Sequence, residues 1–473
     1  MSKNRENLIL MADAYKYSHH KLYYPGTNKI YSYLESRGGK FEETVFYGLQ
    51  YYLKEYLQGV VITQQDVDEA AAFMPHVFGR DDVFDKDKFQ YIVDNCGGKL
   101  PITIKAVAEG TSVPVSNVLM TIESNDPNCF WLTNFLETLL MQIWYPSTVA
   151  SLSREIKIVV TRFFDETATE ASKAGIDFVL NDFGFRGVSS SESAGLGGSA
   201  HLMNFLGSDT LMGSVYAMRY YGATKPVGVS VPATEHSICT LKGEAGELDI
   251  FKHILDTFPT GIVACVSDSF NIFRACSEYW GEELKAQILA RDGVLVIRPD
   301  SGDPVQTLLA IFEILFEKFG YTTNDKGYKV LPPQLKVLQG DGVNYDSIID
   351  VLQALKDNGI SAENLALGMG GALLQKVDRD TQKYALKCSY AEIDGQPINV
   401  QKSPTEMNEK GEIVGSFKKS KAGKLKLIEL DGTFKTVLED EYPELENKLV
   451  TVFENGAVTK EYTFDEIKEN AKL

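Results

Sequence analysis

The sequence contains few cysteines, and none of them are closely paired. Six cysteines are scattered over 473 residues, and no two of them form a Cys-x-x-Cys pair. A disulfide framework is therefore not indicated. Several cysteines lie within apolar runs such as Ala264-Cys265-Val266. This pattern is typical of reduced, buried thiols in a cytoplasmic protein, which is the location we expect.

Positive charge is also scarce. Lysine and arginine together number 47 against 65 aspartates and glutamates, which gives a net charge of −18. A surface this acidic repels nucleic acid and anionic membranes, so neither is expected as a partner. If the ligand is a polyphosphate, a few well-placed arginines and lysines must bind it, because the chain has no basic face to offer.

Long hydrophobic runs are missing as well. The longest apolar stretch, residues 130–145, is interrupted by Asn134, Glu137 and Gln142. It predicts a buried amphipathic helix and not a membrane span. The apolar residues 8–12 are too few for the core of a signal peptide. With 44% hydrophobic and 24% charged residues, the composition is that of an ordinary globular protein, and its length suggests about three domain-sized units.

The middle of the chain alternates short apolar runs with segments of helical spacing. Each run ends abruptly in glycine, aspartate or another polar residue. Strands that alternate with helices predict a parallel sheet, and six or more such units suggest a closed or nearly closed barrel, with a doubly wound open sheet as the alternative. The runs are 178–180, 227–231, 261–266, 294–297, 335–338 and 365–367, and the clearest helices are expected at 269–280, 304–319 and 345–358.

The two ends of the chain have a different pattern. Residues 28–36 and 101–123 alternate as strands do, and Asn455-Gly456 is a hairpin signal. We therefore predict an α/β protein with an irregular TIM-like β/α barrel and a second α/β domain built from both chain ends. The predicted parts are 1–149 for the N-terminal part of that α/β domain, 150–388 for the catalytic barrel, and 389–473 for the C-terminal part.

Polar residues follow the predicted barrel strands at the point where each strand ends. In such barrels the βα loops converge there, so these residues should lie around one rim. Arginine grips pyrophosphate with a fixed fork of donors, carboxylates hold Mg²⁺ or ribose hydroxyls, and glycines before a helix let a phosphate approach. The set consists of Arg186, His236, Asp268, Arg298, Asp300, Asp341, Gly370 and Gly371.

Structural roles compete with functional ones at most of these positions. The glycine pair is more often plain turn chemistry, and a single histidine such as His236 is more often structural. Asp268 can equally cap a helix, and Asp341 can equally be a turn residue. The charged cluster 298–304 is harder to explain without a ligand, because a buried strand seldom ends in so many charges.

Two patterns that suggest other functions can be set aside. Asp182-Phe183-Gly184 matches a kinase triplet, but the chain has no partner motif for it. Residues 195–200 (Gly-Leu-Gly-Gly-Ser-Ala) fit a loose dinucleotide pattern, yet no strand precedes them. This second pattern predicts closely packed helices instead.

Several longer motifs resemble those of the nicotinamide phosphoribosyltransferase family. The resemblance extends over essentially the whole chain, and so many ordered matches are highly specific. The motifs are Asp13-Ala14-Tyr15-Lys16, Glu43-Thr44-Val45-Phe46-Tyr47-Gly48-Leu49-Gln50, Asp182-Phe183-Gly184-Phe185-Arg186-Gly187-Val188-Ser189-Ser190, Gly207-Ser208-Asp209-Thr210, Pro232-Ala233-Thr234-Glu235-His236-Ser237, Ile297-Arg298-Pro299-Asp300-Ser301-Gly302, Gln339-Gly340-Asp341-Gly342-Val343 and Lys387-Cys388-Ser389-Tyr390.

The resemblance implies an enzyme of NAD salvage that forms nicotinamide mononucleotide and pyrophosphate from nicotinamide and 5-phosphoribosyl 1-pyrophosphate. It also implies Mg²⁺ as cofactor, ATP as co-substrate and a homodimer with shared active sites. Phe183 and, from the other subunit, Tyr15 would sandwich the pyridine ring, and Asp209 would accept a hydrogen bond from the carboxamide. His236 would carry a phosphate from ATP and couple its hydrolysis to synthesis.

The remaining implied roles concern the phosphorylated sugar. Arg186, His236 and Arg298 would surround the pyrophosphate, and Asp268 and Asp300 would lie near Mg²⁺, partly through phosphates and water. The other implied contacts are Asp300, Gly340 and Asp341 at the ribose and nucleotide, Gly370 and Gly371 at the 5′-phosphate, and Arg379 and Lys387 from across the dimer interface. One departure is Met369-Gly370-Gly371-Ala372, where the family usually has Ser-Gly-Gly-Gly.

Two alternatives remain beside this interpretation. Nicotinate phosphoribosyltransferase has the same architecture and reaction, but Asp209 would place a carboxylate against the carboxylate of nicotinate. A catalytically inactive binding protein on the same scaffold would have lost polar residues at the rim, and none of the rim positions has been replaced by an apolar residue.

Overall fold

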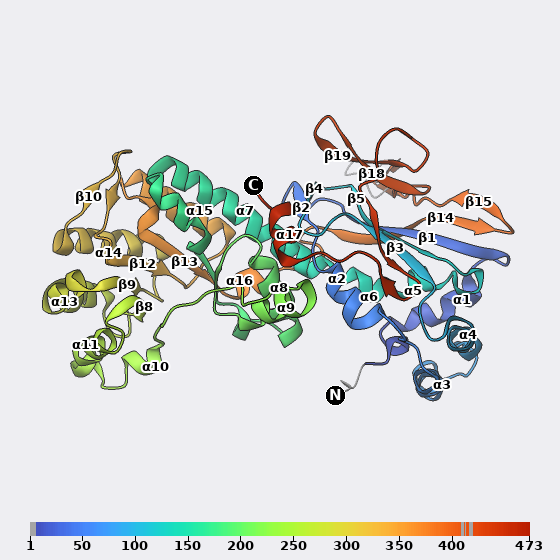
Figure 1. Cartoon of the computed structure of the whole chain (residues 1–473), viewed down its shortest axis with the longest axis horizontal. Coiled ribbons are helices and arrows are strands. Elements are labelled where there is room, and N and C mark those ends of the chain that lie inside the picture. The colour runs from blue at the N-terminus through green and yellow to red at the C-terminus, as the bar shows by residue number, and fades with distance from the viewer. Residues whose placement is uncertain (1–5, 408–410, 412, 416–419) are drawn as a thin grey trace. The chain divides into compact units, whose positions relative to one another are not determined.

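Figure 1 shows the computed structural model of the chain, which describes residues 6–407, 411, 413–415 and 420–473. The chain divides into two compact units. The first unit draws on both ends of the chain, and the second is formed by its middle. They comprise Met1–Ser151, Tyr220–Gly222 and Asp378–Ala471 for the first, and Leu152–Arg219, Ala223–Val377 and Lys472–Leu473 for the second. The domain boundaries given above stay predictions.

The second unit is built around a six-stranded sheet in which every strand pairs in parallel. Its strands are β6 (Leu180–Asp182), β7 (Gly207–Ser208), β8 (Thr260–Val266), β9 (Asp292–Arg298), β12 (Leu335–Gln339) and β13 (Leu365–Met369). Their order is β7-β6-β13-β12-β9-β8. Single bridges join Val229 to Gly207 at one edge and Ala233 to Ala264 at the other. The parallel α/β arrangement is therefore confirmed, whereas a full TIM-like barrel stays a prediction.

Amphipathic helices connect these strands. In α14, Pro304 takes the first position, the Asp303 side chain caps the N-terminus by accepting from the Gln306 N–H, and Gly320 ends the helix with a positive φ of 77°. One face of α14 buries leucine, isoleucine and phenylalanine side chains. The helices of this unit are α8 (Ser191–His201), α9 (Leu211–Tyr221, extending into the first unit), α10 (His236–Cys239), α11 (Glu247–Thr257), α12 (Ile272–Arg274), α13 (Lys285–Ala290), α14 (Pro304–Phe319), α15 (Tyr345–Asp357) and α16 (Gly371–Leu374).

The close helix packing predicted for residues 195–200 is confirmed. A Cβ at Gly195 would lie 2.4 Å from the Tyr216 ring, and a Cβ at Gly213 would lie 2.7 Å from the carbonyl carbon of Gly198. The two helices α8 and α9 approach one another so closely that only glycine fits at these contacts.

The first unit contains a seven-stranded sheet of order β15-β14-β1-β5-β3-β20-β21, whose neighbouring strands pair antiparallel. Its strands are β1 (Thr27–Ser36), β3 (Ile102–Ala106), β5 (Val118–Ser124), β14 (Tyr384–Ile393), β15 (Gln396–Asn399), β20 (Val450–Glu454) and β21 (Ala457–Val458). The hairpin predicted at Asn455-Gly456 is confirmed between β20 and β21, with φ values of 48° and 83°.

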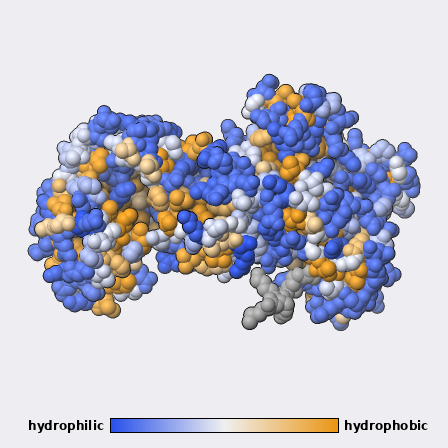
Figure 2. Space-filling model, in the orientation of Figure 1, coloured by the Kyte–Doolittle hydropathy of each residue, from blue (hydrophilic) through white to orange (hydrophobic). Residues whose placement is uncertain are grey.

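The remaining elements complete both units. They are the strand pairs β2 (Glu43–Val45) with β4 (Ser112–Pro114), β10 (Thr322–Thr323) with β11 (Lys329–Val330), β16 (Thr405–Met407) with β17 (Ile413–Gly415), and β18 (Leu425–Leu430) with β19 (Thr433–Leu438), and the helices α1 (His19–Leu22), α2 (Leu49–Tyr52), α3 (Gln64–Phe78), α4 (Lys86–Cys96), α5 (Leu132–Phe135), α6 (Glu137–Met141), α7 (Trp144–Thr167) and α17 (Phe464–Asn470). Hydrophilic residues cover most of the face seen in Figure 2, with smaller apolar areas between them.

Three predicted elements differ from the structure. Residues 227–231 form no strand and contribute only the bridge at Val229. The single helix expected at 130–145 is broken into α5, α6 and the start of α7. The helix expected from 269 begins at Ile272, because the Asn271 side chain caps it by accepting from two backbone N–H groups, and it continues with π-helical geometry over Ala275–Glu283. Among the described residues, no helix combines the length and apolar character needed to cross a membrane.

Candidate active site

The predicted site residues of the second unit follow the carboxyl ends of its parallel strands. Since the strands run in the same direction, these ends share one edge of the sheet. The structure thus places most of these residues as the sequence pattern predicts, but His236 does not directly follow a strand, because residues 227–231 form none. Phe183 follows β6, Asp268 follows β8, Asp300 follows Arg298 at the end of β9, Gly340 and Asp341 follow β12, and Gly370 and Gly371 follow β13.

His236, Asp268 and Asp300 form one connected group. The Asp268 side chain is only 4% exposed, and its Oδ1 lies 3.1 Å from Nε2 of His236. Its Oδ2 accepts from the Asp300 backbone N–H at 2.9 Å and from the Ser301 hydroxyl at 2.7 Å. The imidazole is 49% exposed, and its Nδ1 faces Oδ2 of Asp300 at 4.0 Å. Asp268 therefore fixes one ring nitrogen of His236 and leaves the other directed at Asp300. It does not cap α12.

Arg298 connects this group to the aromatic ring of Phe183. Its Nη2 donates to Oδ1 of Asp300 at 2.6 Å, and its guanidinium carbon lies 5.3 Å from the centroid of the Phe183 ring. A Cβ at Gly340 would come within 3.1 Å of Nε of Arg298. Glycine at this position therefore leaves the guanidinium room beside the end of β12.

Short-range contacts hold Phe183 at the end of β6. Its backbone N–H donates to the Met369 carbonyl at 3.0 Å, and Oδ1 of Asp182 accepts from the Gly184 N–H at 2.7 Å. A Cβ at Gly368 would lie 2.0 Å from the Phe183 ring, so the ring lies directly against the backbone of β13. Burial raises the pKa of Asp182 to about 6, with nearby Asp209 adding to the shift and the Gly184 N–H opposing it.

A cavity of about 250 Å³ lies beside Phe183 in the second unit. Asp209 and Arg298 contribute polar groups to its lining, and Val296 and Leu338 belong to its apolar wall. The Ser230 hydroxyl donates to Oδ1 of Asp209. The cavity therefore combines an aromatic face, an apolar wall and an oriented carboxylate, as a flat ligand with a polar substituent requires.

The other predicted residues of this unit lie at its surface. Arg186 is exposed within a short 3₁₀ turn over Phe185–Gly187, and Asp341 is exposed after β12. Gly371 begins α16, and a Cβ there would meet no atom within 4 Å. The space beside Gly371 is therefore open to a ligand group.

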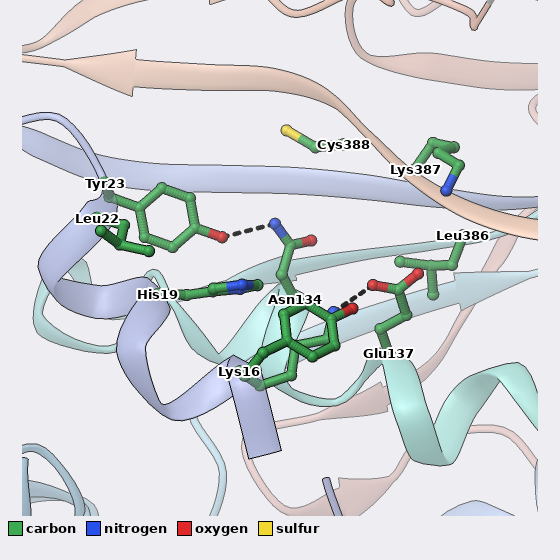
Figure 3. Close-up of a pocket in the computed structure, with 10 residues that line it drawn as sticks. Lys16, His19, Leu22, Tyr23, Asn134, Glu137, Leu386, Lys387 and Cys388 are labelled. Carbon is green, nitrogen blue, oxygen red and sulfur yellow. Dashed lines mark hydrogen bonds and ion pairs between the residues drawn. The ribbon is translucent and has the colours of Figure 1, made fainter. Parts of the chain in front are cut away.

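Tyr15 and Lys387, which are 372 positions apart, line one pocket in the first unit. Its volume is about 430 Å³, and Figure 3 shows the side chains around it. Lys16 forms an ion pair with Glu137, and the Asn134 amide donates to the Tyr23 hydroxyl at 2.7 Å. The further lining residues are His19, Leu22, Leu386 and Cys388.

Lys387 lies in a positively charged environment. Burial lowers the pKa of its ammonium, and the cations Arg37, Lys402 and Arg379 lower it further, whereas Glu137 raises it. Arg379 itself is exposed and donates to Asp380 at 3.1 Å. Several cations near one another in an acidic chain suit an anionic ligand.

Some residues of the site were missed by the sequence analysis. Asp182 accepts from the Gly184 N–H next to Phe183, the Ser230 hydroxyl donates to Asp209, and the Ser301 hydroxyl donates to Asp268. Asp182 could have been found, since it is a carboxylate at the end of a predicted strand. Ser230 lies in a segment that was predicted to be a strand, and nothing in its local sequence indicates its contact with Asp209.

Comparisons with known proteins identify the family of the chain. The Nicotinate phosphoribosyltransferase (NAPRTase) family model matches residues 178–455, and the model of the nicotinamide phosphoribosyltransferase N-terminal domain matches residues 7–104. The chain is 45% identical to a nicotinamide phosphoribosyltransferase of Xanthomonas campestris pv. campestris (strain 8004), with 98% of each chain covered. A nicotinamide phosphoribosyltransferase of Acinetobacter baylyi is 30% identical, with 98% of this chain and 97% of the relative covered.

Two solved structures share the fold at low sequence identity. A nicotinate-nucleotide pyrophosphorylase from Pyrococcus furiosus aligns with a TM-score of 0.59 at 14% identity, covering 99% of this chain and 96% of the other. Human nicotinic acid phosphoribosyltransferase aligns with a TM-score of 0.54 at 15% identity, covering 98% and 93%. From the sequence matches over nearly its whole length, the chain belongs to the nicotinamide phosphoribosyltransferase family.

Proposed function

We propose that the chain transfers the phosphoribosyl group of 5-phosphoribosyl 1-pyrophosphate to nicotinamide, forming nicotinamide mononucleotide and pyrophosphate for NAD synthesis. The observation that carries this proposal is the cavity between Phe183 and Asp209, together with the group formed by His236, Asp268 and Arg298. One side of this site accepts a flat aromatic amide, and the other offers charge to a phosphorylated sugar.

The base binds through its ring and its amide. The pyridine ring stacks on Phe183, and the carboxamide N–H₂ donates to Asp209. The Ser230 hydroxyl occupies Oδ1 of Asp209. Oδ2 is then the oxygen that receives the amide. Nicotinate would instead bring a second carboxylate against Asp209, and that repulsion selects nicotinamide.

The reaction is a displacement at the anomeric carbon of the ribose. The bond from this carbon to the pyrophosphate oxygen breaks, positive charge develops on the ribose ring, and the lone pair of the pyridine nitrogen forms the new C–N bond. No proton needs to be removed from that nitrogen. Catalysis then rests on holding the two reactants in line and on stabilising the departing pyrophosphate with Arg298 and Arg186.

Carboxylate oxygens are suited to Mg²⁺, and Asp268 and Asp300 supply them at this rim. The Asp268 side chain is 4% exposed, whereas that of Asp300 is 25% exposed. Asp300 would therefore hold the ion and Asp268 would act on it through water. When bound, Mg²⁺ neutralises charge on the leaving pyrophosphate.

The orientation of His236 supports the proposed coupling to ATP hydrolysis. Because Nε2 faces Asp268, Nδ1 is the ring nitrogen with a lone pair directed at the rim. Nδ1 would attack the γ-phosphorus of ATP and form a phosphohistidine, with ADP as the leaving group. The phosphate on His236 strengthens binding of the cation and of the substrate. Water later hydrolyses the phosphohistidine and releases inorganic phosphate.

We propose that a second copy of the chain completes the site, as the family resemblance implies. Tyr15, Arg379 and Lys387 belong to the first compact unit, and Phe183 and Asp209 belong to the second. In the proposed homodimer, Tyr15 of one copy closes the other face of the pyridine ring in its partner. Lys387 and Arg379 of the same copy likewise contact the phosphate groups of the substrate bound in the partner.

The test is a pyrophosphate-release assay with 5-phosphoribosyl 1-pyrophosphate, Mg²⁺ and either base, with and without ATP. We expect release with nicotinamide, stimulation by ATP, and much slower release with nicotinate. Asp209→Ser should reduce the preference for nicotinamide in a competition between the two bases. Asp256→Ser, an exposed aspartate of α11, is the matched control. Equal use of both bases by the wild type would support nicotinate phosphoribosyltransferase instead, and no release with either base would refute both.

A further inference from the structure

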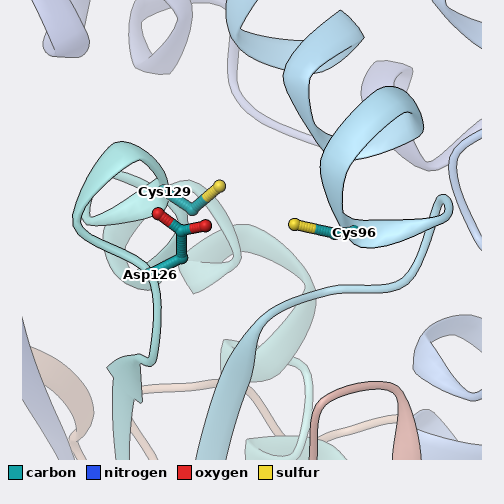
Figure 4. Close-up of side chains that lie close together, drawn as sticks. All are labelled: Cys96, Asp126 and Cys129. Atoms are coloured by element: carbon teal, nitrogen blue, oxygen red, sulfur yellow. The ribbon is translucent and has the colours of Figure 1, made fainter.

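A second group of reactive side chains lies in the first unit and takes no part in the proposed reaction. Cys96 ends α4, while Asp126 caps and Cys129 ends the short 3₁₀ helix Pro127–Cys129 that follows β5. The two sulfurs and a carboxylate oxygen all lie within 4.8 Å of one another, and Figure 4 shows them directed toward a common point. Residues separated by about thirty positions thus present three ligand atoms to one small volume.

Two contacts hold the carboxylate in place. Oδ1 of Asp126 accepts from the Asn128 backbone N–H at 2.8 Å, and Oδ2 accepts from the Tyr91 hydroxyl at 3.0 Å. The Asn128 side chain also donates to the Tyr91 hydroxyl at 3.0 Å. Outer hydrogen bonds of this kind orient the ligands of metal sites and raise their affinity.

We propose that Cys96, Asp126 and Cys129 form a binding site for a thiophilic divalent cation such as Zn²⁺. Two thiolates and one carboxylate make a favourable ligand set for this ion. Metal–sulfur bonds of about 2.3 Å and metal–oxygen bonds of about 2.0 Å place the ligands of a tetrahedral site roughly 3.5 Å apart. The observed separation therefore requires only a small closure of the three side chains, with water as the fourth ligand.

The surroundings agree with entry of an ion from solvent. Cys129 is buried, whereas Cys96 and Asp126 are partly exposed, so one side of the group is accessible. The ion would fasten the end of α4 to the segment after β5.

The experiment uses Co²⁺ as a spectroscopic probe, with the whole protein kept reduced and free of other metals. We expect sulfur-to-cobalt charge-transfer bands in the near ultraviolet and one equivalent of Co²⁺ that Zn²⁺ displaces. Cys96→Ser with Cys129→Ser should remove the bands, and Asp126→Asn and Tyr91→Phe should each weaken binding by at least about tenfold. Cys388→Ser, another partly exposed thiol, should leave the spectrum unchanged.

Thermal unfolding provides a readout that does not depend on the spectrum. Zn²⁺ should raise the Tm of the wild type and of Cys388→Ser, and it should not raise the Tm of the double variant. Absence of charge-transfer bands in the wild type, or bands that persist in the double variant, would overturn the proposal. A Cys96–Cys129 disulfide that survives reductant would overturn it as well.

Discussion

Gly368 controls the position of the Phe183 ring, and Gly368→Ala tests whether that ring binds the base. A Cβ at residue 368 would lie 2.0 Å from the ring, whereas ordinary contact begins near 3.4 Å. The ring must therefore move by more than about 1 Å or the strand must shift. The backbone of β13 is paired on both sides, with β6 and β12, so the ring is the part that yields.

Two magnitudes follow from this displacement. Overpacking of a filled interior costs about 1–3 kcal/mol of folding free energy. An aromatic stacking contact is worth about 0.5–1.5 kcal/mol, so its loss should raise the KM for nicotinamide by about two- to tenfold. Since the phosphorylated sugar does not touch Phe183 in the proposed complex, its KM should change by less than about twofold.

Steady-state kinetics with each substrate varied in turn measure this difference. Gly175→Ala is the matched control, because a Cβ at residue 175 of the same unit would meet no atom within 4 Å. Circular dichroism and thermal unfolding establish that both variants are folded. A correctly folded Gly368→Ala protein with an unchanged KM for nicotinamide would refute the role of Phe183 in binding the base.

Four further predictions concern coupling, shared sites and stability. His236→Ala should abolish the stimulation by ATP and leave slow basal synthesis, and stimulation that persists in kinetic assays would exclude His236 from that role. Arg298→Ala and Lys387→Ala should each be nearly inactive alone. When the two variants are refolded together, about half of the dimers should be mixed, each with one intact site, so about a quarter of wild-type activity should return. No recovery of activity would contradict a shared site. Gly213→Ala should lower the free energy of unfolding by about 1–3 kcal/mol in urea titrations, since the atom it meets at 2.7 Å belongs to the backbone of α8, and an unchanged midpoint would show that the helices can separate. Burial raises the pKa of Glu109 from 4.5 to about 7, so its contribution to the free energy of unfolding is complete below about pH 4.5 and is lost as the pH rises through 7. Up to about 3 kcal/mol of stability should be lost in the wild type, and Glu109→Gln should lose less over the same range. Equal pH profiles of stability for the two proteins would contradict the shift.

The residues at the rim of the site could be predicted because the carboxyl ends of parallel strands lie at one edge of the sheet, so residues that follow different strands lie close together. Arg298 and Asp300 follow one strand, and Asp268 follows its neighbour, so a strand-by-strand pattern was sufficient to place them together. The hydrogen bond from the Asp300 backbone to Asp268 was not visible in the sequence, but it is a consequence of the same arrangement. The placement of Arg298 and Asp300 beside Asp268 is therefore confirmed, whereas the function of the charged cluster at residues 298–304 stays a prediction.

Other parts depend on contacts that no local pattern contains. Tyr15 and Lys387 meet because β1 pairs with β14 across more than 350 residues, and only the family resemblance indicated a joint role for them. Residues 227–231 have the composition of a strand, yet Val229 makes only a single bridge at one edge of the sheet. The break between α5 and α6 was equally hidden, because apolar spacing continues through Leu136.

The binding mode of the products can be determined from a crystal structure of the protein with nicotinamide mononucleotide and pyrophosphate. We expect the pyridine ring against Phe183, its amide nitrogen within hydrogen-bond distance of Asp209, and pyrophosphate oxygens bound by Arg298. Nucleotide bound elsewhere, with these three side chains making no contact to the products, would refute the proposed site.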